Sequence, residues 1–169
     1  MYRIFVVLTA ILISAFYWAG PQARAVSREV KFAVFSDPHL YDGSLGTTGS
    51  AFENYLSQDR KMIRESEAIL KATVNSLLEE DVDFVLVPGD LTKDGELASH
   101  KMFKQYIDIL ENNGIKVFPI CGNHDINNPH AFSYNEDNTI PVKSLSPWQF
   151  RALYRKNAYS RAIYKHRRS

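Results

Sequence analysis

Three short apolar segments of this chain alternate with two longer segments whose apolar residues recur every three or four positions. The apolar segments are residues 30–36, 84–87 and 115–120, and they are rich in valine, isoleucine and phenylalanine. The longer segments, residues 58–80 and 97–111, have the periodicity of amphipathic helices. The order strand, helix, strand, helix, strand predicts a parallel sheet with right-handed crossovers. The expected fold class is therefore α/β.

Polar residues that can bind metal follow each predicted strand directly. Asp37 and His39 follow the first strand, and Asp90 follows the second. Asn123 and His124 follow the third. Because the carboxyl ends of parallel strands meet at one edge of a sheet, where ligands bind, we expect these side chains to converge on one crevice. Each residue alone is typical of a turn, but three such clusters at three successive strand ends favour a metal site.

The side chains of this predicted site suit two metal ions. Asp37 and His39 are two residues apart and can turn onto one cation. The Asp90 carboxylate can bridge two cations, and the Asn123 side chain offers a neutral oxygen to the second. Oxygen and nitrogen ligands without a thiolate suit divalent or trivalent Mn, Fe or Zn. Two such ions clamp a phosphoryl group and generate a hydroxide nucleophile at neutral pH, which makes a phosphoester the expected substrate.

His124 and Asp125 are the residues to which we assign catalytic roles from the sequence. His124 directly follows the expected ligand Asn123, so we expect its ring to face the substrate. There it would protonate the leaving-group oxygen or stabilise the charge on the phosphoryl group. Asp125 is expected to orient that imidazole from behind.

Three motifs in this order resemble the first three sequence blocks of the calcineurin-like metallophosphoesterase superfamily. They are DPHL at residues 37–40, GDLTKDG at 89–95 and GNHD at 122–125. Each is weak alone, but the ordered set is specific. The resemblance extends from about Val30 to Tyr164 and is to the N-terminal part of an exported bacterial branch of that superfamily.

The resemblance implies an enzyme that hydrolyses phosphomonoesters or phosphodiesters at a dinuclear metal centre, with a metal-bound hydroxide as the nucleophile. It places Asp37 and His39 on the first metal, Asp90 between the two metals, and Asn123 on the second. It places His124 near the leaving group. It also implies that the predicted sheet is the parallel-sheet half of an α/β/β/α sandwich.

The chain departs from the family pattern in two respects. The later blocks, an isolated histidine and a Gly-His-x-His motif that complete both metal shells, do not occur in it. Cys121 stands where a proline is usual before Gly-Asn-His. The alternative expectation is therefore a truncated, catalytically incomplete fragment that binds metal weakly and is inactive.

The N-terminal segment predicts export. Arg3 precedes an apolar run at residues 4–19, and the small-x-small pattern Ala23-Arg24-Ala25 follows it. This arrangement is typical of a secretory signal peptide over residues 1–25, which leaves residues 26–169 as the phosphoesterase domain. The expected location is secreted or periplasmic. The alternative is a membrane anchor formed by residues 4–19, and membrane contact is expected only in that case.

Composition and charge narrow the choice of partners. A length of 169 residues favours one folded domain after the leader. Residues 151–169 hold seven basic residues and no acidic ones, whereas residues 1–150 hold 13 basic and 19 acidic residues. A basic tail alone is more often a solvated end, so no nucleic-acid partner is expected. A protein that binds membranes or nucleic acid through this tail is the weaker alternative.

The remaining polar residues have structural interpretations. Residues 37–55 are rich in Gly, Ser and Thr and predict a long loop, and another polar loop is expected after Pro129. Asp94, Gly95 and Glu96 are expected to cap the second helix. His100 on that helix is expected to be structural, and a short last helix is expected to begin at Ser146.

Overall fold

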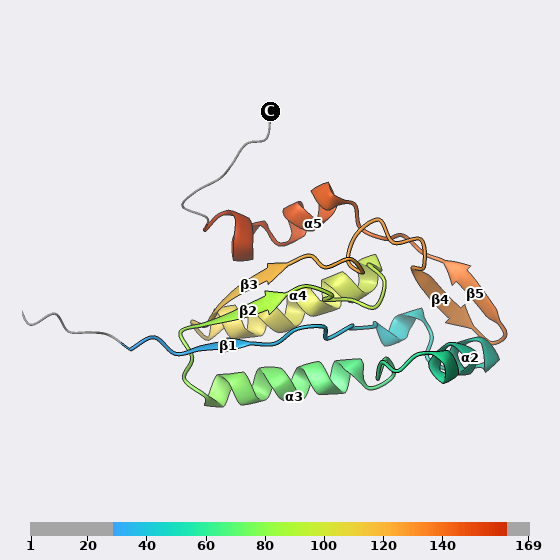
Figure 1. The fold of residues 1–169 in the computed structure, drawn as a ribbon, viewed down its shortest axis with the longest axis horizontal. Coiled ribbons are helices and arrows are strands. Elements are labelled where there is room, and N and C mark those ends of the chain that lie inside the picture. The colour runs from blue at the N-terminus through green and yellow to red at the C-terminus, as the bar shows by residue number, and fades with distance from the viewer. Residues whose placement is uncertain (1–28, 162–169) are drawn as a thin grey trace, which may run out of the picture.

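A three-stranded parallel sheet lies at the centre of the computed structural model, which describes residues 29–161 (Figure 1). Its strands are β1 (Phe32–Val34), β2 (Phe84–Pro88) and β3 (Lys116–Ile120), in the spatial order β1-β2-β3. Phe84 of β2 pairs with Phe32 on one side and with Lys116 on the other. The α/β class and the parallel pairing are therefore confirmed. The predicted signal peptide and residues 162–169 of the basic tail lie outside the described residues.

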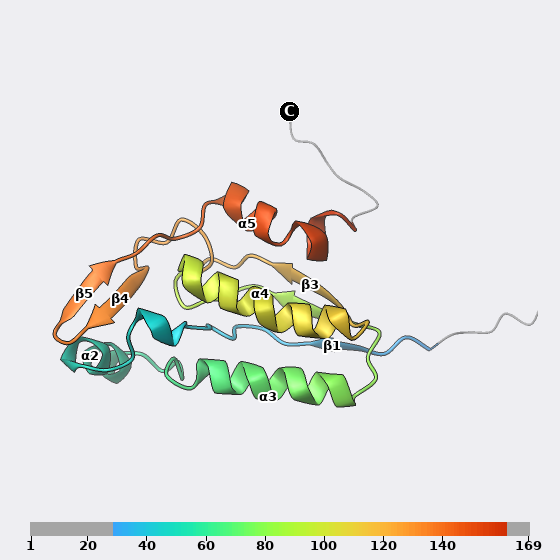
Figure 2. The ribbon, with the colours of Figure 1, turned by 180° about the vertical axis from the view of Figure 1, so that it is seen from behind.

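Two helices pack with this sheet into the main core (Figure 2). They are α3 (Ser66–Glu79) and α4 (Leu97–Asn112), and Gly114, with φ of 87°, ends α4 in the left-handed conformation expected for it. Side chains alternate between the two faces of a strand, so only alternate strand residues reach the helices. The buried apolar residues of the two helices and the sheet are Leu70, Val74, Leu77, Val85, Val87, Phe103, Ile107, Leu110 and Val117.

Helix α3 is shorter, and its buried face is narrower, than the apolar pattern of residues 58–80 suggests. Helix α3 begins at Ser66, and the preceding residues form turns instead of the predicted first helical turns. Met62 is 61% exposed, and Ile69 and Leu78 are also exposed, although the helical periodicity of residues 58–80 predicts all three on the inner face of one helix. The reason is geometric: α3 contacts the core along one narrow stripe, so apolar residues just beside that stripe face solvent.

A second, smaller unit forms where the sequence predicted only loops. It contains the short 3-10 helix η1 (Gly43–Leu45), helix α2 (Ser50–Gln58) and a hairpin of β4 (Phe132–Asn135) and β5 (Asn138–Pro141). A Cβ atom at Gly49 would lie 2.4 Å from the backbone oxygen of Glu136, so this glycine lets α2 approach the hairpin. The unit has its own apolar cluster, made by Tyr41, Phe52, Ile63 and Tyr134.

The chain after the hairpin returns to the main core. Helix α5 (Pro147–Leu153) begins as predicted, with Ser146 as its N-cap and a capping box completed by Gln149. A π-helical turn, η2 (Arg155–Tyr159), follows it.

The face of the sheet opposite α3 and α4 is apolar and open, because Phe32, Val34 and Ile120 are each more than half exposed. Within the described residues, no helix is long and apolar enough to cross a membrane.

Asp125 joins the loops that follow β2 and β3. Its carboxylate is fully buried and accepts hydrogen bonds from the backbone N–H groups of Leu91 at 3.1 Å, Thr92 at 2.9 Å and Gly122 at 2.8 Å. The Thr92 hydroxyl adds a fourth bond at 3.0 Å. A buried carboxylate with this many donors is fully satisfied, so it fixes the two loops relative to each other.

We expect Asp125→Ala to lower the free energy of unfolding by at least about 3 kcal/mol, because three buried backbone donors lose an ionised acceptor. Urea denaturation followed by circular dichroism measures this loss. The control is Asp108→Ala, which removes a surface pair with Lys104 and is expected to cost less than about 1 kcal/mol. Equal effects of the two substitutions would show that Asp125 does not hold the loops together.

His100 predicts a pH dependence of stability. It is completely buried, its Nε2 lies 2.8 Å from the Asp125 carbonyl oxygen, and its Nδ1 lies 3.0 Å from the Tyr154 hydroxyl. The carbonyl can only accept, so Nε2 carries the proton of a neutral ring and Nδ1 accepts from Tyr154. Burial lowers the pKa of His100 below its ordinary value of 6.5. These buried hydrogen bonds agree with the structural role that the sequence predicts for His100.

Below about pH 6.5 the unfolded chain binds a proton at His100, whereas the folded chain keeps this imidazole neutral because it is buried. The free energy of unfolding is therefore expected to fall as the pH decreases. Urea titrations between pH 5 and 8 test this slope. In His100→Gln the slope over this window is expected to flatten, whatever the absolute stability. An unchanged slope in that variant would assign the pH dependence to other groups.

Candidate metal centre

Three of the predicted metal ligands adopt a backbone conformation that non-glycine residues rarely use. The φ angles of Asp37, His39 and Asp90 are 55°, 40° and 48°, all in the left-handed region. Such residues cost on the order of 1–3 kcal/mol each and gather where function requires a particular side-chain direction. Backbone bonds hold this arrangement, because Asp37 N–H donates to the Gly89 carbonyl oxygen and His39 N–H to that of Asp90.

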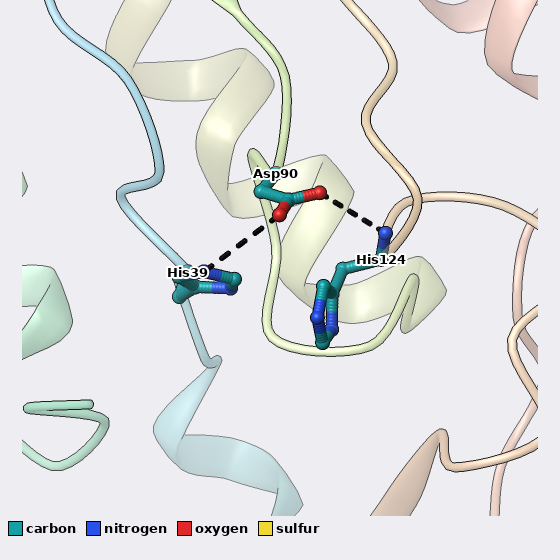
Figure 3. A group of neighbouring side chains, drawn as sticks. All are labelled: His39, Asp90 and His124. Carbon is teal, nitrogen blue, oxygen red and sulfur yellow. Dashed lines mark hydrogen bonds and ion pairs between the residues drawn. The ribbon is translucent and has the colours of Figure 1, made fainter. Parts of the chain in front are cut away.

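His39, Asp90 and His124 form a group that could hold a metal ion (Figure 3). One ligand atom from each lies within 4.8 Å of the others, and the side chains of His39 and Asp90 are only 12% and 14% exposed. His39 Nε2 lies 3.9 Å from Asp90 Oδ2 and 3.9 Å from Asp37 Oδ1. Two ligands of one ion can be about 4.2 Å apart at most, twice a bond of about 2.1 Å. His39 is therefore close enough to the carboxylates of Asp37 and Asp90 to share a cation with each of them.

The chemistry of His39 also fits a metal ligand. Burial, assisted by the nearby charge of Lys61, lowers the pKa of His39, so its ring is neutral near pH 7 and a nitrogen lone pair is available. Its buried Nδ1 has no hydrogen-bond partner among the described residues. The other ring nitrogen, Nε2, lies beside the carboxylates of Asp37 and Asp90 and is the atom that a cation there would reach.

Asp37 and Asn123 are placed differently from this group. The Asp37 side chain is 59% exposed and lies on the solvent side of His39, where it accepts a hydrogen bond from Ser36. Asn123 is exposed as well and precedes His124 at the mouth of the site. Asp37 is therefore within reach of the His39 cation position. The ligand role of Asn123 stays a prediction from the sequence.

The imidazole of His124 is held by its Nδ1 atom. Nδ1 lies 2.8 Å from the Lys93 carbonyl oxygen and 2.9 Å from Asp94 Oδ1, and both of these atoms can only accept when Asp94 is ionised. Nδ1 therefore carries a proton, and Nε2 remains available to a ligand. The backbone N–H of His124 donates to Asp90 Oδ1 at 3.0 Å, and the ring packs edge to face against His39.

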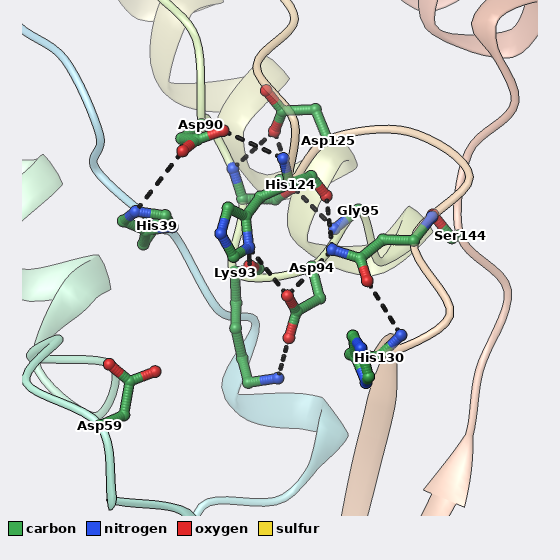
Figure 4. Close-up of polar contacts among 12 residues, drawn as sticks. His39, Asp59, Asp90, Lys93, Asp94, Gly95, His124, Asp125, His130 and Ser144 are labelled. Atoms are coloured by element: carbon green, nitrogen blue, oxygen red, sulfur yellow. Dashed lines mark hydrogen bonds and ion pairs between the residues drawn. The ribbon is translucent and has the colours of Figure 1, made fainter.

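The prediction of which acid binds the His124 imidazole was wrong. Asp125 was expected to orient His124, but both oxygens of its buried carboxylate are taken by donors in the two loops. Asp94 does the orienting instead (Figure 4). The sequence had predicted Asp94, Gly95 and Glu96 as caps of this helix, and the N-cap of α4 is Glu96. The sequence signal that could have identified Asp94 was its position in the polar loop after the second strand, four residues after Asp90.

Comparison with known proteins finds one relative of assigned function. A segment of 59 residues is 39% identical to a probable cyclic nucleotide phosphodiesterase of Ruthia magnifica subsp. Calyptogena magnifica. The match spans 35% of this chain and 24% of that relative.

The family comparison covers far more of the chain. The model of the calcineurin-like phosphoesterase family matches residues 30–165, which include β1, β2, β3 and every residue of the candidate metal centre. This chain belongs to the calcineurin-like phosphoesterase family.

Proposed function

We propose that this protein hydrolyses phosphoesters with the help of bound metal ions. The observation that carries the proposal is the convergence of His39, Asp90 and His124 at the carboxyl ends of three parallel strands in a chain of this family. The similarity to a probable cyclic nucleotide phosphodiesterase makes phosphodiesters the first substrates to test, with phosphomonoesters as the second class.

The proposed centre holds two ions of Mn, Fe or Zn. Asp37, His39 and Asp90 would hold the first, and Asp90 with Asn123 would contribute to the second. Metal ions bound there neutralise the charge of the phosphoryl group and supply a nucleophile at neutral pH. The oxygen and nitrogen donors of this set are those that such ions accept.

His124 acts on the leaving group in this proposal. Its Nδ1 proton is held by Asp94 and by the Lys93 carbonyl oxygen, so the ring cannot turn freely. In the form of the ring that carries a proton on both nitrogens, Nε2 would donate its proton to the departing oxygen as a general acid, and the neutral ring with its Nδ1 proton would remain. The His39 ring against its edge limits the ring further.

The exposure of part of the site favours the alternative, a catalytically incomplete centre. Asp37 is more than half exposed, and the apolar sheet face beside the site is open. A centre that is this open would bind metal weakly and would be inactive without further ligands. The two readings differ in measured metal stoichiometry: two tight sites favour the hydrolase, and one weak site favours the incomplete centre.

Export is the proposed route of the protein, on the sequence pattern of residues 1–25. Sequencing of the amino terminus of the protein recovered from its native host tests this. A mature chain that begins at Val26 is expected, whereas a chain that retains residues 4–19 would indicate a membrane anchor.

We expect His39→Ala to weaken the binding of Mn²⁺ by at least about 10-fold, because it removes a neutral imidazole from the most buried part of the centre. Isothermal titration calorimetry measures the affinity and the stoichiometry. His130→Ala is the matched control, since His130 is exposed and outside the group. Unchanged affinity in His39→Ala would place any metal elsewhere.

We expect Asp90→Asn to lower the hydrolysis of bis(4-nitrophenyl) phosphate or 4-nitrophenyl phosphate by at least about 100-fold, since the bridging charge of the centre is lost. Asp108→Asn on the outer surface of α4 is expected to leave the rate unchanged. Hydrolysis that survives Asp90→Asn would come from a contaminant or from another site.

A further inference from the structure

We propose that the buried Lys93 is a positioning residue, which acts through Asp94 to hold His124 in the orientation that leaving-group protonation requires. The proposal rests on the proposed phosphoester hydrolysis, because it concerns the residue to which that reaction assigns the proton. It starts from an uncommon feature: the Lys93 side chain is only 1% exposed. Lysine is almost never fully buried unless its charge is paired.

The surroundings of the Lys93 ammonium form a cage for a cation. Its Nζ lies 4.3 Å from the ring centre of Tyr55, 5.9 Å from that of Tyr41 and 5.8 Å from that of Tyr134. The faces of aromatic rings carry negative electrostatic potential, so three rings around one ammonium attract it. The carboxylate of Asp94 completes the cage, with Oδ2 at 2.5 Å from Nζ.

Asp94 connects this cation to the imidazole, because its two oxygens have different partners (Figure 4). Oδ2 is bound to Lys93, and Oδ1 accepts from His124 Nδ1 at 2.9 Å and from the Asn128 amide at 3.0 Å. A carboxylate fixed at one oxygen by a buried ammonium can turn only slightly. Lys93 therefore determines where Oδ1 lies, and with it the tilt of the His124 ring.

A second acid beside Lys93 does not replace Asp94. Glu96 is buried too, but its Oε1 lies 3.8 Å from Lys93 Nζ, beyond hydrogen-bond distance. Its Oε2 accepts from the backbone N–H of Asp94 at 3.1 Å. Glu96 thus supports the turn that carries Asp94, whereas Lys93 contacts the carboxylate itself.

The cage connects the small unit of α2 and the hairpin to the site. Tyr55 belongs to α2, Tyr134 to β4, and Tyr41 lies between β1 and η1. These segments are far apart in the sequence and meet around one ammonium. The packing of the small unit is thereby linked to His124, although none of the three rings makes a hydrogen bond with that imidazole.

The test uses Lys93→Met, which keeps the length of the side chain and removes its charge. Two esters of whichever class the wild-type protein hydrolyses are compared, the 4-nitrophenyl ester and the ethyl ester. Nitrophenolate departs without protonation, whereas ethoxide requires it. We expect kcat for the ethyl ester to fall by at least about 10-fold more than kcat for the nitrophenyl ester, with KM within about twofold of the wild-type value.

Two comparisons separate positioning from a general loss of structure. Lys104→Met removes a lysine that also pairs with an aspartate, Asp108, far from the site, and it is expected to change neither rate. Tyr55→Leu removes the nearest ring of the cage and is expected to shift the ester preference in the same direction as Lys93→Met, by a smaller factor. Tyr55→Leu decides the matter if Lys93→Met does not fold. Equal losses on both esters would overturn the proposal.

A measurement without turnover keeps this proposal separate from the proposed function. In the wild-type protein, the His124 Nδ1 proton bound to Asp94 is expected to give a downfield resonance in the proton NMR spectrum. We expect this resonance to disappear or move upfield in Lys93→Met and in Tyr55→Leu, and to remain in Lys104→Met. If the protein hydrolyses neither ester, the proposed function fails and this resonance still tests the positioning. A resonance that is unchanged in Lys93→Met would overturn the role of Lys93.

Discussion

The buried carboxylate of Asp125 is the interaction on which the candidate site depends. It accepts from three backbone N–H groups and one hydroxyl, and these donors come from the loops after both β2 and β3. Asp90 and His124 lie in these two loops, so their relative position follows from this one contact. A Cβ atom at Gly122 would lie 2.4 Å from the backbone nitrogen of Asp90, which shows how closely the loops approach. The absence of a side chain there is what permits the contact.

The backbone around the predicted ligands is strained, and hydrogen bonds between the loops of the site hold it in that conformation. Asp37, His39 and Asp90 all have positive φ angles, which the pairing of the loops after β1 and β2 maintains. Such a site is arranged before any ligand binds, because the ordering of the side chains is completed during folding. The neutral ring of His39, whose Nε2 lies beside the carboxylates of Asp37 and Asp90, agrees with a position prepared for a cation.

The small unit of α2 and the hairpin stabilises a charge beside the site without contributing a ligand. Its tyrosine rings surround Lys93, and Lys93 binds the carboxylate that holds His124. Burying an ammonium is costly unless ring faces and carboxylates replace its water. The arrangement is therefore stable only when the main sheet and the small unit are both folded, which links the packing of one to the geometry of the other.

The sequence by itself determined the main sheet, both of its covering helices and the three loops that carry Asp37, His39, Asp90 and His124. Those features follow from local periodicity and from polar residues at strand ends, which a sequence displays directly. Only the tertiary structure decided the small unit, the burial of Lys93 and the fact that Asp94 instead of Asp125 binds the His124 imidazole. Asp94 and Asp125 are both acids next to the site. Which of them reaches the imidazole depends on hydrogen bonds between segments about thirty residues apart, and spacing along the chain does not encode those bonds.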